Sequence, residues 1–318
     1  MKIVLSIIAL SIAFFSQAFA ATNYPTKGVT IIVPFPPAAP PDILTRVLSS
    51  GLSEKWKQPV NVENRPGAGG LVGTAAVARA NPDGHTILLN VASVLTYKLF
   101  VKDLNFDPLR DLRPVAKIAS YSLVAAIPPQ LGPKTLKEFI AYAKARPKAL
   151  NYAVIPYATM DLDLAIFLEK AGLDMVRVPT PGGAQFMTTM VRNDAQITLS
   201  SVSQLRPYLA NGRLLAVATT GRQRMTQLPD VPTFLESNID FVTESSNGLY
   251  VPRKTPSDVA AKIAADAISV AHSPSIASKL ENLGYDLSDL VLDEYEKEVR
   301  VSAEIYAQTA RKLGLEAQ

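Results

Sequence analysis

Short apolar runs alternate with apolar-periodic stretches along most of the chain. The run VTIIV at Val29–Val33, between a glycine and a proline, predicts a buried strand. Apolar spacing from Asp42 to Trp56 predicts a helix with Asp42 as its N-cap. The same reading predicts further strands at 59–62, 86–89, 123–127, 175–178, 196–199, 214–218 and 248–251, and helices at 71–80, 135–146, 257–271, 275–283 and 293–312. Repeated strand–helix units predict an α/β fold with mainly parallel sheets and helices on both faces.

The first twenty residues form a separate unit. Lys2 precedes an apolar run from Ile3 to Phe15, and Ala18-Phe19-Ala20 is an A-x-A site. These are the three parts of a secretory signal peptide, so we expect export and cleavage after Ala20. The run is shorter than the roughly 20 apolar residues of a membrane-spanning helix, which disfavours an anchor. In a bacterium with two membranes, the exported protein would reside in the periplasm.

Composition narrows the chemistry that the protein can perform. The chain has 318 residues, of which 48% are hydrophobic and 19% charged, as in a globular protein large enough for two domains. It contains no cysteine, which excludes disulfides, cysteine nucleophiles and thiolate metal sites. With two histidines and a net charge of +4 that no Lys/Arg cluster concentrates, we expect no metal, no cofactor and no nucleic-acid partner.

Three motifs that suggest chemistry have plainer interpretations. In the glycine-rich segment 67–73, the third glycine of a dinucleotide fingerprint is replaced by Val72, so we expect a packed strand–turn–helix corner. A periplasmic hydrolase is an alternative, but no G-x-S-x-G motif is present and only His85 and His272 offer a histidine base. Asp161 and Asp163 stand two residues apart, so we expect first-turn acids rather than a metal site.

Loops that join a strand to the next helix are the remaining candidates for a site. They span residues 34–42, 153–159 and 179–184. Helix N-termini present free N–H groups and a positive dipole end, which suit carboxylates. Every α/β protein has such loops, so on their own they are equally consistent with a binding protein and with other functions.

A series of short motifs in a fixed order links this chain to a known family. Two are specific: ENRPGAGG at 63–70 and LPDVPT at 228–233. They stand in order with VPFPP at 33–37, PDG at 82–84, FDP at 106–108 and NGRL at 211–214. From about Tyr24 to Gly284 the chain resembles the Bug-type solute receptors, the extracytoplasmic binding proteins of tripartite tricarboxylate transporters.

The resemblance implies a fold, a partner and a class of ligand. It implies the two-lobed type II periplasmic-binding-protein fold, with lobe one at 21–121 plus 244–318, lobe two at 122–243, and a ligand cleft between them that closes by hinge motion. Family ligands are mostly small carboxylates. We expect a monomer, without catalytic residues, that delivers its ligand to transporter membrane subunits; a receptor of the same fold that serves a periplasmic sensor is the alternative.

The resemblance also places the ligand site and shows where this chain departs from the family. The family usually has Gly-Gly-x-Thr/Ser before the aspartate, whereas this chain has Ala38-Ala39-Pro40-Pro41, and its 153–159 loop is apolar. We therefore expect a ligand with a larger apolar or aromatic part and one carboxylate or none. The predicted site has Phe35 and Tyr157 as walls. Its other members lie at helix starts in both lobes: Ala38, Ala39, Asp42, Ala158, Thr159, Thr180, Gly182, Gly183, Ala184, Ser200, Ser201 and Ser203.

Overall fold

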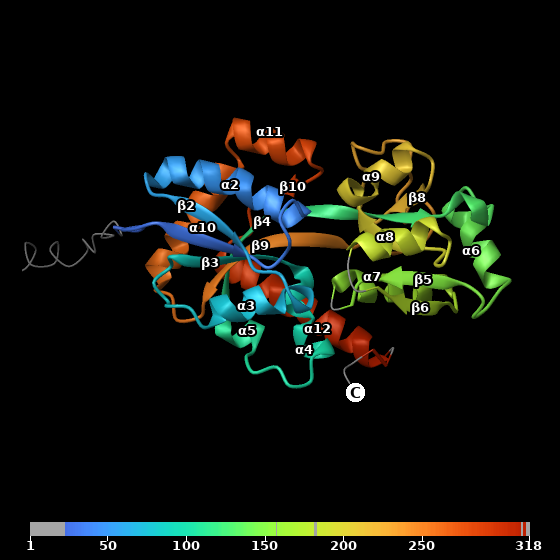
Figure 1. Cartoon of the computed structure of the whole chain (residues 1–318), viewed down its shortest axis with the longest axis horizontal. Helices are drawn as coiled ribbons and strands as arrows, with labels where there is room; N and C mark the ends of the chain where they lie inside the picture. The colour runs from blue at the N-terminus through green and yellow to red at the C-terminus, as the bar shows by residue number, and fades with distance from the viewer. Residues whose placement is uncertain (1–22, 157, 181–182, 313, 316–318) are drawn as a thin grey trace, which may run out of the picture.

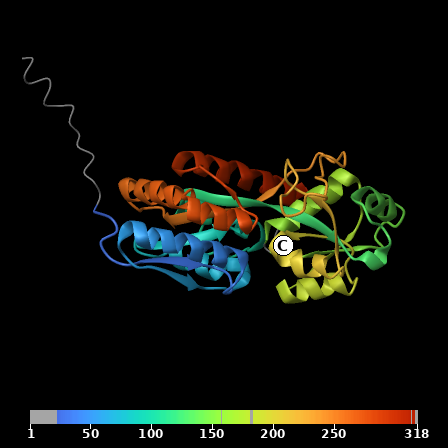
Figure 2. The same ribbon diagram turned by 90° about the horizontal axis from the view of Figure 1, so that it is seen from above.

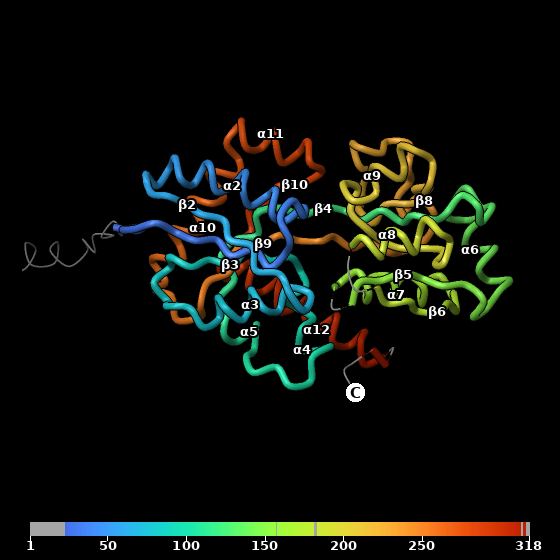
Figure 3. Tube along the Cα trace, viewed as in Figure 1, coloured from blue at the N-terminus to red at the C-terminus, as the bar shows by residue number. Residues whose placement is uncertain are grey.

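The protein consists of two lobes that lie side by side and share two long strands. The computed structural model describes residues 23–156, 158–180, 183–312 and 314–315, so the predicted signal peptide, Tyr157 and Gly182 lie outside the described residues. Strands β4 (Leu112–Ile127) and β9 (Glu244–Pro252) run from one lobe into the other (Figure 1). The Cα trace shows that they are the connections at the centre of the molecule (Figure 3).

The first lobe is built on a mixed sheet with the strand order β10-β4-β9-β3-β1-β2. β1 (Val29–Val33) is parallel to β2 (Val60–Asn64) and β3 (Thr86–Val91). β9 is antiparallel to β3 and β4, and the short β10 (Asp286–Leu287) is antiparallel to β4. The prediction of mainly parallel sheets is therefore wrong. The strands that carry the chain out of this lobe and back again run in opposite directions, so their pairing is antiparallel.

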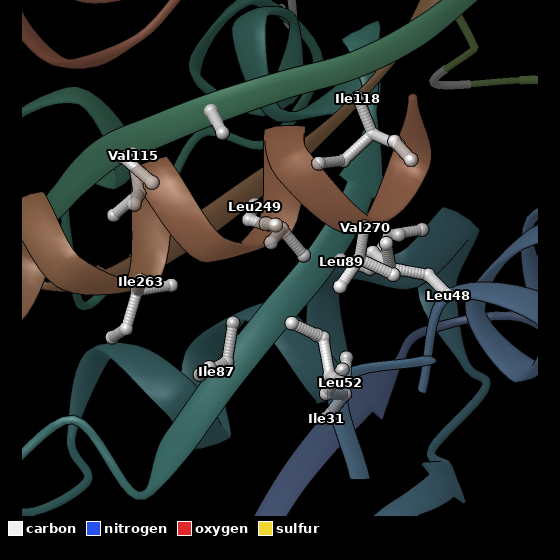
Figure 4. Packing of buried hydrophobic residues seen from close by; sticks show 14 of the residues in the cluster. Ile31, Leu48, Leu52, Ile87, Leu89, Val115, Ile118, Leu249, Ile263 and Val270 are labelled. Carbon is white, nitrogen blue, oxygen red and sulfur yellow. The ribbon is translucent and has the colours of Figure 1, made fainter. Parts of the chain in front are cut away.

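Helices cover both faces of this sheet. One face packs against α2 (Pro40–Trp56), α10 (Ser257–Ala271) and α11 (Pro274–Asn282). Figure 4 shows Leu48 and Leu52 of α2 and Ile263 of α10 against the sheet residues Ile31 and Leu249, all of them fully buried. Each such side chain stabilises the fold by about 1.5–3 kcal/mol relative to an exposed one. The opposite face packs against α3 (Leu71–Ala78) and α12 (Leu292–Lys312).

The second lobe uses the far end of β4. Here β4 pairs antiparallel with β7 (Thr198–Ser201) and β8 (Leu215–Thr219), while β5 (Asn151–Val154) and β6 (Val176–Pro179) form a parallel pair beside β7. Figure 2 shows this lobe from above, with helices around its strands. The helices are α6 (Leu136–Lys144), α7 (Thr159–Ala171), α8 (Gly183–Val191) and α9 (Val202–Ala210). The short helices α4 (Tyr97–Phe100) and α5 (Pro108–Asp111) belong to the first lobe.

Several predicted elements match the structure, and two differ for identifiable reasons. The strand at 29–33 and the helix at 257–271 have the predicted bounds. The predicted strand 123–127 is only the end of β4, whose first part contains polar residues and Pro114 and so lacks an apolar run. Asp42 is not an N-cap: α2 begins at Pro40, and Ala39 occupies the N-cap position without a side-chain hydrogen bond. Within the described part of the chain, no helix is both long and apolar enough to cross a membrane.

Candidate functional site

The predicted loops of the second lobe meet at one edge of its strands. β5 and β6 are parallel neighbours with Val154 opposite Pro179, and β7 lies beside β5, so all three strands end on the same side. Thr180 follows β6, and both its N–H and its hydroxyl donate to the Val154 carbonyl at 2.9 Å. The hydroxyl of Thr180 therefore holds two loops together inside the lobe, where Thr180 is 2% exposed.

The serines at the end of β7 and in the first turn of α9 form a small hydrogen-bonded group with a residue that the sequence did not single out, Gln204. Ser201 caps α9, where its Oγ accepts from the Gln204 N–H at 3.3 Å and lies 3.1 Å from the Ser203 Oγ. Ser200 Oγ donates to Gln204 Oε1 at 2.7 Å. A Cβ on Gly183 would lie 3.1 Å from Gln204 Nε2, so Gln204 also packs against the start of α8. The structure thus brings Gly183, Ser200, Ser201 and Ser203 together around Gln204.

Two helix N-termini in this lobe supply backbone donors. α8 begins at Gly183 without an acidic residue in its first turn, and Ala184 is exposed. The first N–H groups of a helix have no carbonyl partner within it, and together with the dipole they attract an anion. α7 begins at Thr159 after Ala158, but Thr159 is buried close to Tyr306 of α12. The start of α8 is therefore the more exposed of the two helix N-termini.

The corresponding loop of the first lobe, residues 34–42, uses its polar groups internally. The buried Asp42 carboxylate accepts from the Ala38 N–H at 2.8 Å, from Arg46 Nε at 3.0 Å and from Asn64 Nδ2 at 2.8 Å. Asn64 Nδ2 also donates to the carbonyl of the half-buried Phe35 at 3.1 Å. Burial raises the pKa of Asp42, but the hydrogen bonds from Arg46, Asn64 and Ala38 bring it below its usual value.

This loop consequently offers few donors to a ligand. Ala38 N–H is held by Asp42, and the Ala39 N–H donates to the Pro36 carbonyl at 3.2 Å. The next two residues, Pro40 and Pro41, have no N–H. No hydrogen bond or ion pair links residues 34–42 with 153–203 in the portion of the chain that the structure describes. The two halves of the predicted site are therefore separate surfaces in this structure.

Ala38 has a backbone conformation that favours glycine. Its φ is 64°, in the left-handed region, where a Cβ costs about 1–2 kcal/mol. We expect Ala38→Gly to raise the free energy of unfolding by about 0.5–1 kcal/mol, after the greater flexibility of glycine in the unfolded chain is subtracted. Ala277→Gly, inside α11, should instead lower it by about 1 kcal/mol. Urea unfolding of both variants measures the difference, and equal losses in the two would contradict the assigned conformation.

Sequence reasoning also missed a buried amide on β9. Asn247 is fully buried, and neither its Oδ1 nor its Nδ2 has a hydrogen-bond partner among the described residues. It lies opposite Ala119 of β4 and Val91 of β3, where the two lobes are connected. Only its place in the connecting strand β9, between β3 and β4, distinguishes this asparagine, and that place depends on the strand order.

Neither histidine is placed for hydrolase chemistry. His85 Nδ1 lies 3.0 Å from the Asp83 carbonyl, and its ring packs on Tyr24 with centroids 5.1 Å apart. Its Nε2 is buried and has no hydrogen-bond partner in the part of the chain that the structure describes. His272 caps the end of α10 and contacts Asp289 Oδ1 at 3.1 Å. A serine nucleophile within hydrogen-bond reach of a histidine is not found among the contacts of the described residues. The same residues contain no group of three or more metal-ligating side chains.

Comparison with known proteins agrees with this architecture. The fold is that of a two-lobed binding protein. The tripartite tricarboxylate transporter family receptor model matches residues 44–308, and the chain belongs to this family. Protein BugT of Bordetella pertussis is 30% identical over 252 residues, which cover 78% of this chain and 77% of BugT.

Solved structures give the same result. The Rpa4515 protein of R. palustris, solved with adipate, superposes with a TM-score of 0.83 at 25% identity and covers 92% of this chain and 98% of its own. MatC from Rhodopseudomonas palustris with bound malate gives a TM-score of 0.77 at 25% identity, covering 90% and 99%. The periplasmic binding protein BugD gives 0.80 at 26% identity, covering 93% and 100%. The predicted family and two-lobed fold are therefore confirmed.

Proposed function

We propose that this protein is a periplasmic receptor that captures a small organic acid and delivers it to the membrane subunits of a tripartite tricarboxylate-type transporter. The observation that carries the proposal is the open N-terminus of α8 beside the amide group of Gln204, in a member of this receptor family. Relatives of the same fold were solved with adipate and with malate, both carboxylates. The receptor acts as a monomer after its signal peptide is removed behind Ala20.

The ligand carries a single carboxylate and a larger apolar or aromatic part. The carboxylate binds at the start of α8, where Gly182, Gly183 and Ala184 supply N–H groups, with Ser201 and Ser203 nearby. The first lobe contributes mainly apolar surface, including Phe35, because the donors of its loop are used by Asp42 and Pro36 or replaced by prolines. Tyr157 forms a second wall. A dicarboxylate would leave its second carboxylate without donors, and this desolvation costs binding energy.

The lobes meet where β4 changes partners. β4 pairs with β9 as far as Ser122 and with β7 and β8 from Leu123 onward. This change of partners supports a division of the chain into lobe one, at 21–121 plus 244–318, and lobe two, at 122–243. The paired strands β4 and β9 are then the hinge about which the lobes close on the ligand.

The α8 N–H groups are tested by two substitutions at Gly183. Gly183→Pro removes one N–H at the first helical position, where proline is tolerated. Gly183→Ala adds a Cβ near the flexible Gln204 side chain but keeps the N–H. One hydrogen bond to a charged group contributes about 1.5–3 kcal/mol, so we expect the proline variant to bind hexanoate or benzoate at least tenfold more weakly. The alanine variant should stay within about threefold of the wild type.

Calorimetry with hexanoate, benzoate, adipate and malate measures both the ligand preference and the effect of each variant. Circular dichroism verifies the fold of the variants. Tighter binding of malate than of hexanoate and benzoate would contradict the single-carboxylate ligand. Equal affinities in the proline and alanine variants would show that the carboxylate binds elsewhere.

A further inference from the structure

A cavity of about 680 Å³ lies behind the connecting strands, and none of the residues of the predicted ligand site is in its lining. Glu244, Ser246 and Tyr250 of β9 line it, whereas the intervening Leu249 packs in the core under α2 and α10. The cavity is therefore on the α12 face of the sheet. Its walls come from both lobes, because Ile166 of α7 and residues of α12 line it together.

A buried carboxyl group forms part of the wall. Asp163 is 3% exposed, and its Oδ1 accepts from Thr243 Oγ1 at 2.9 Å and from the Tyr306 hydroxyl at 3.1 Å. Burial raises the pKa of the Asp163 carboxyl to about 7, against the lowering effect of these two hydrogen bonds. No cation pairs with Asp163 among the residues described, so its ionised form lacks a countercharge.

The other charges around the cavity are largely matched with one another. Lys117 pairs with Glu298 at 2.9 Å, and Lys170 pairs with Asp240 at 3.7 Å. Glu244 accepts from Ser120 Oγ at 2.8 Å, and Arg222 is exposed to solvent. Acidic groups thus outnumber basic ones, and Asp163 is the buried acid without a cation. The remaining wall includes apolar surface, which the side chains of Leu95, Phe241 and Ile305 provide.

We propose that this cavity is a second ligand site, which binds a small primary amine with an apolar chain and places its ammonium group against Asp163. An ammonium group supplies the missing countercharge and donates hydrogen bonds to the carboxylate. The apolar chain lies along the apolar wall, and the volume falls within the roughly 300–1,000 Å³ of small-molecule sites. The proposal does not rest on the organic-acid site, which uses other residues and the opposite charge.

Three probes with the same six-carbon chain test the site: hexylammonium, hexanol and hexanoate. Calorimetry at pH 8, with the wild-type protein, should show that hexylammonium binds at least tenfold more tightly than hexanol. Equal affinities for these two would overturn the proposal, because the ammonium group would then contribute nothing. Hexanoate binding belongs to the organic-acid site, so its presence or absence tests the proposed function separately.

Two variants and the pH dependence of hexylammonium affinity test whether the ammonium group contacts Asp163. Asp163→Asn keeps the shape and can still accept the hydrogen bonds from Thr243 and Tyr306, and it should weaken hexylammonium binding at least tenfold. Tyr306→Phe keeps the carboxyl group and should retain binding. Because the ammonium needs ionised Asp163 with its pKa of about 7, the wild-type affinity should fall about tenfold from pH 8 to pH 6. Hexylammonium affinity that is unchanged by Asp163→Asn or by pH would overturn the assignment.

Discussion

Replacing Arg177 with methionine should lower the free energy of unfolding by about 3–5 kcal/mol. Asp161 lies in the first turn of α7 and is fully buried. Its carboxylate accepts from Arg177 Nε at 2.9 and 3.1 Å, and Arg177 Nη2 makes a further contact with Oδ2. Without the guanidinium, the Asp161 carboxylate loses its only ion-pair partner among the described residues. Removing one partner of a buried ion pair is strongly destabilising because it leaves a buried charge without a countercharge.

Arg224→Met is the matched control. Arg224 pairs with Glu236, but both side chains are exposed, at 44% and 45%, so water replaces the lost partner. We therefore expect Arg224→Met to lower the free energy of unfolding much less than Arg177→Met does. The double variant Asp161→Leu, Arg177→Met should recover most of the stability lost in Arg177→Met, because no buried charge remains. Urea unfolding measures all three. Similar losses for Arg177→Met and Arg224→Met would contradict a structural role for the buried pair.

The second large effect is expected from Gly248→Ala in β9. A Cβ at this position would lie 1.9 Å from the Tyr295 hydroxyl oxygen and 2.7 Å from its Cζ. Tyr295 is 1% exposed, and its hydroxyl forms a 2.7 Å hydrogen bond with that of Tyr250, so the ring has little room to move. Overpacking of this kind lowers the free energy of unfolding by about 1–3 kcal/mol. Because the contact is so close, we expect a loss at the upper end of this range for Gly248→Ala.

Gly28→Ala provides the control, because a Cβ there meets its nearest atom at 3.5 Å, an ordinary contact. Tyr295→Ala removes the obstructing ring, and the loss of this buried side chain lowers the stability by itself. The double variant Gly248→Ala, Tyr295→Ala should therefore be less destabilised than the sum of the two single variants, by about 1–3 kcal/mol. Thermal unfolding of the four proteins gives this coupling. Additive losses would show that the ring does not cause the effect.

The sequence predicts the elements that are buried on both faces better than it predicts how they pair. The β-branched run at Val29–Val33 is a strand because both of its faces meet helices. The polar first part of β4 hides its strand character, since Arg113 and Lys117 interrupt the apolar pattern and find partners in Ser257 and Glu298. The antiparallel pairing of β4 with β9 depends on residues more than a hundred positions apart, which no local pattern reveals.

For the candidate site, the sequence and its family resemblance indicate which loops to examine but not what their side chains contact. The hydroxyl of Thr180 faces inward because its loop lies against the Val154 carbonyl of β5, a neighbour set by strand order. Asp163 is buried because Tyr306 of α12, far along the chain, packs on it. Two residues of the predicted site, Tyr157 as a wall and Gly182 as an N–H donor, lie outside the described residues, so their roles stay predictions.

The position of β4 in the chain has a consequence for the order of folding. This single strand pairs with β7, β8, β9 and β10, all of which follow it in the sequence. Neither lobe can complete its sheet before these later strands have been synthesised, and such long-range pairings are slow to form. A chain that folds late stays unfolded for longer, and an unfolded chain is the form that passes through a narrow protein-conducting channel.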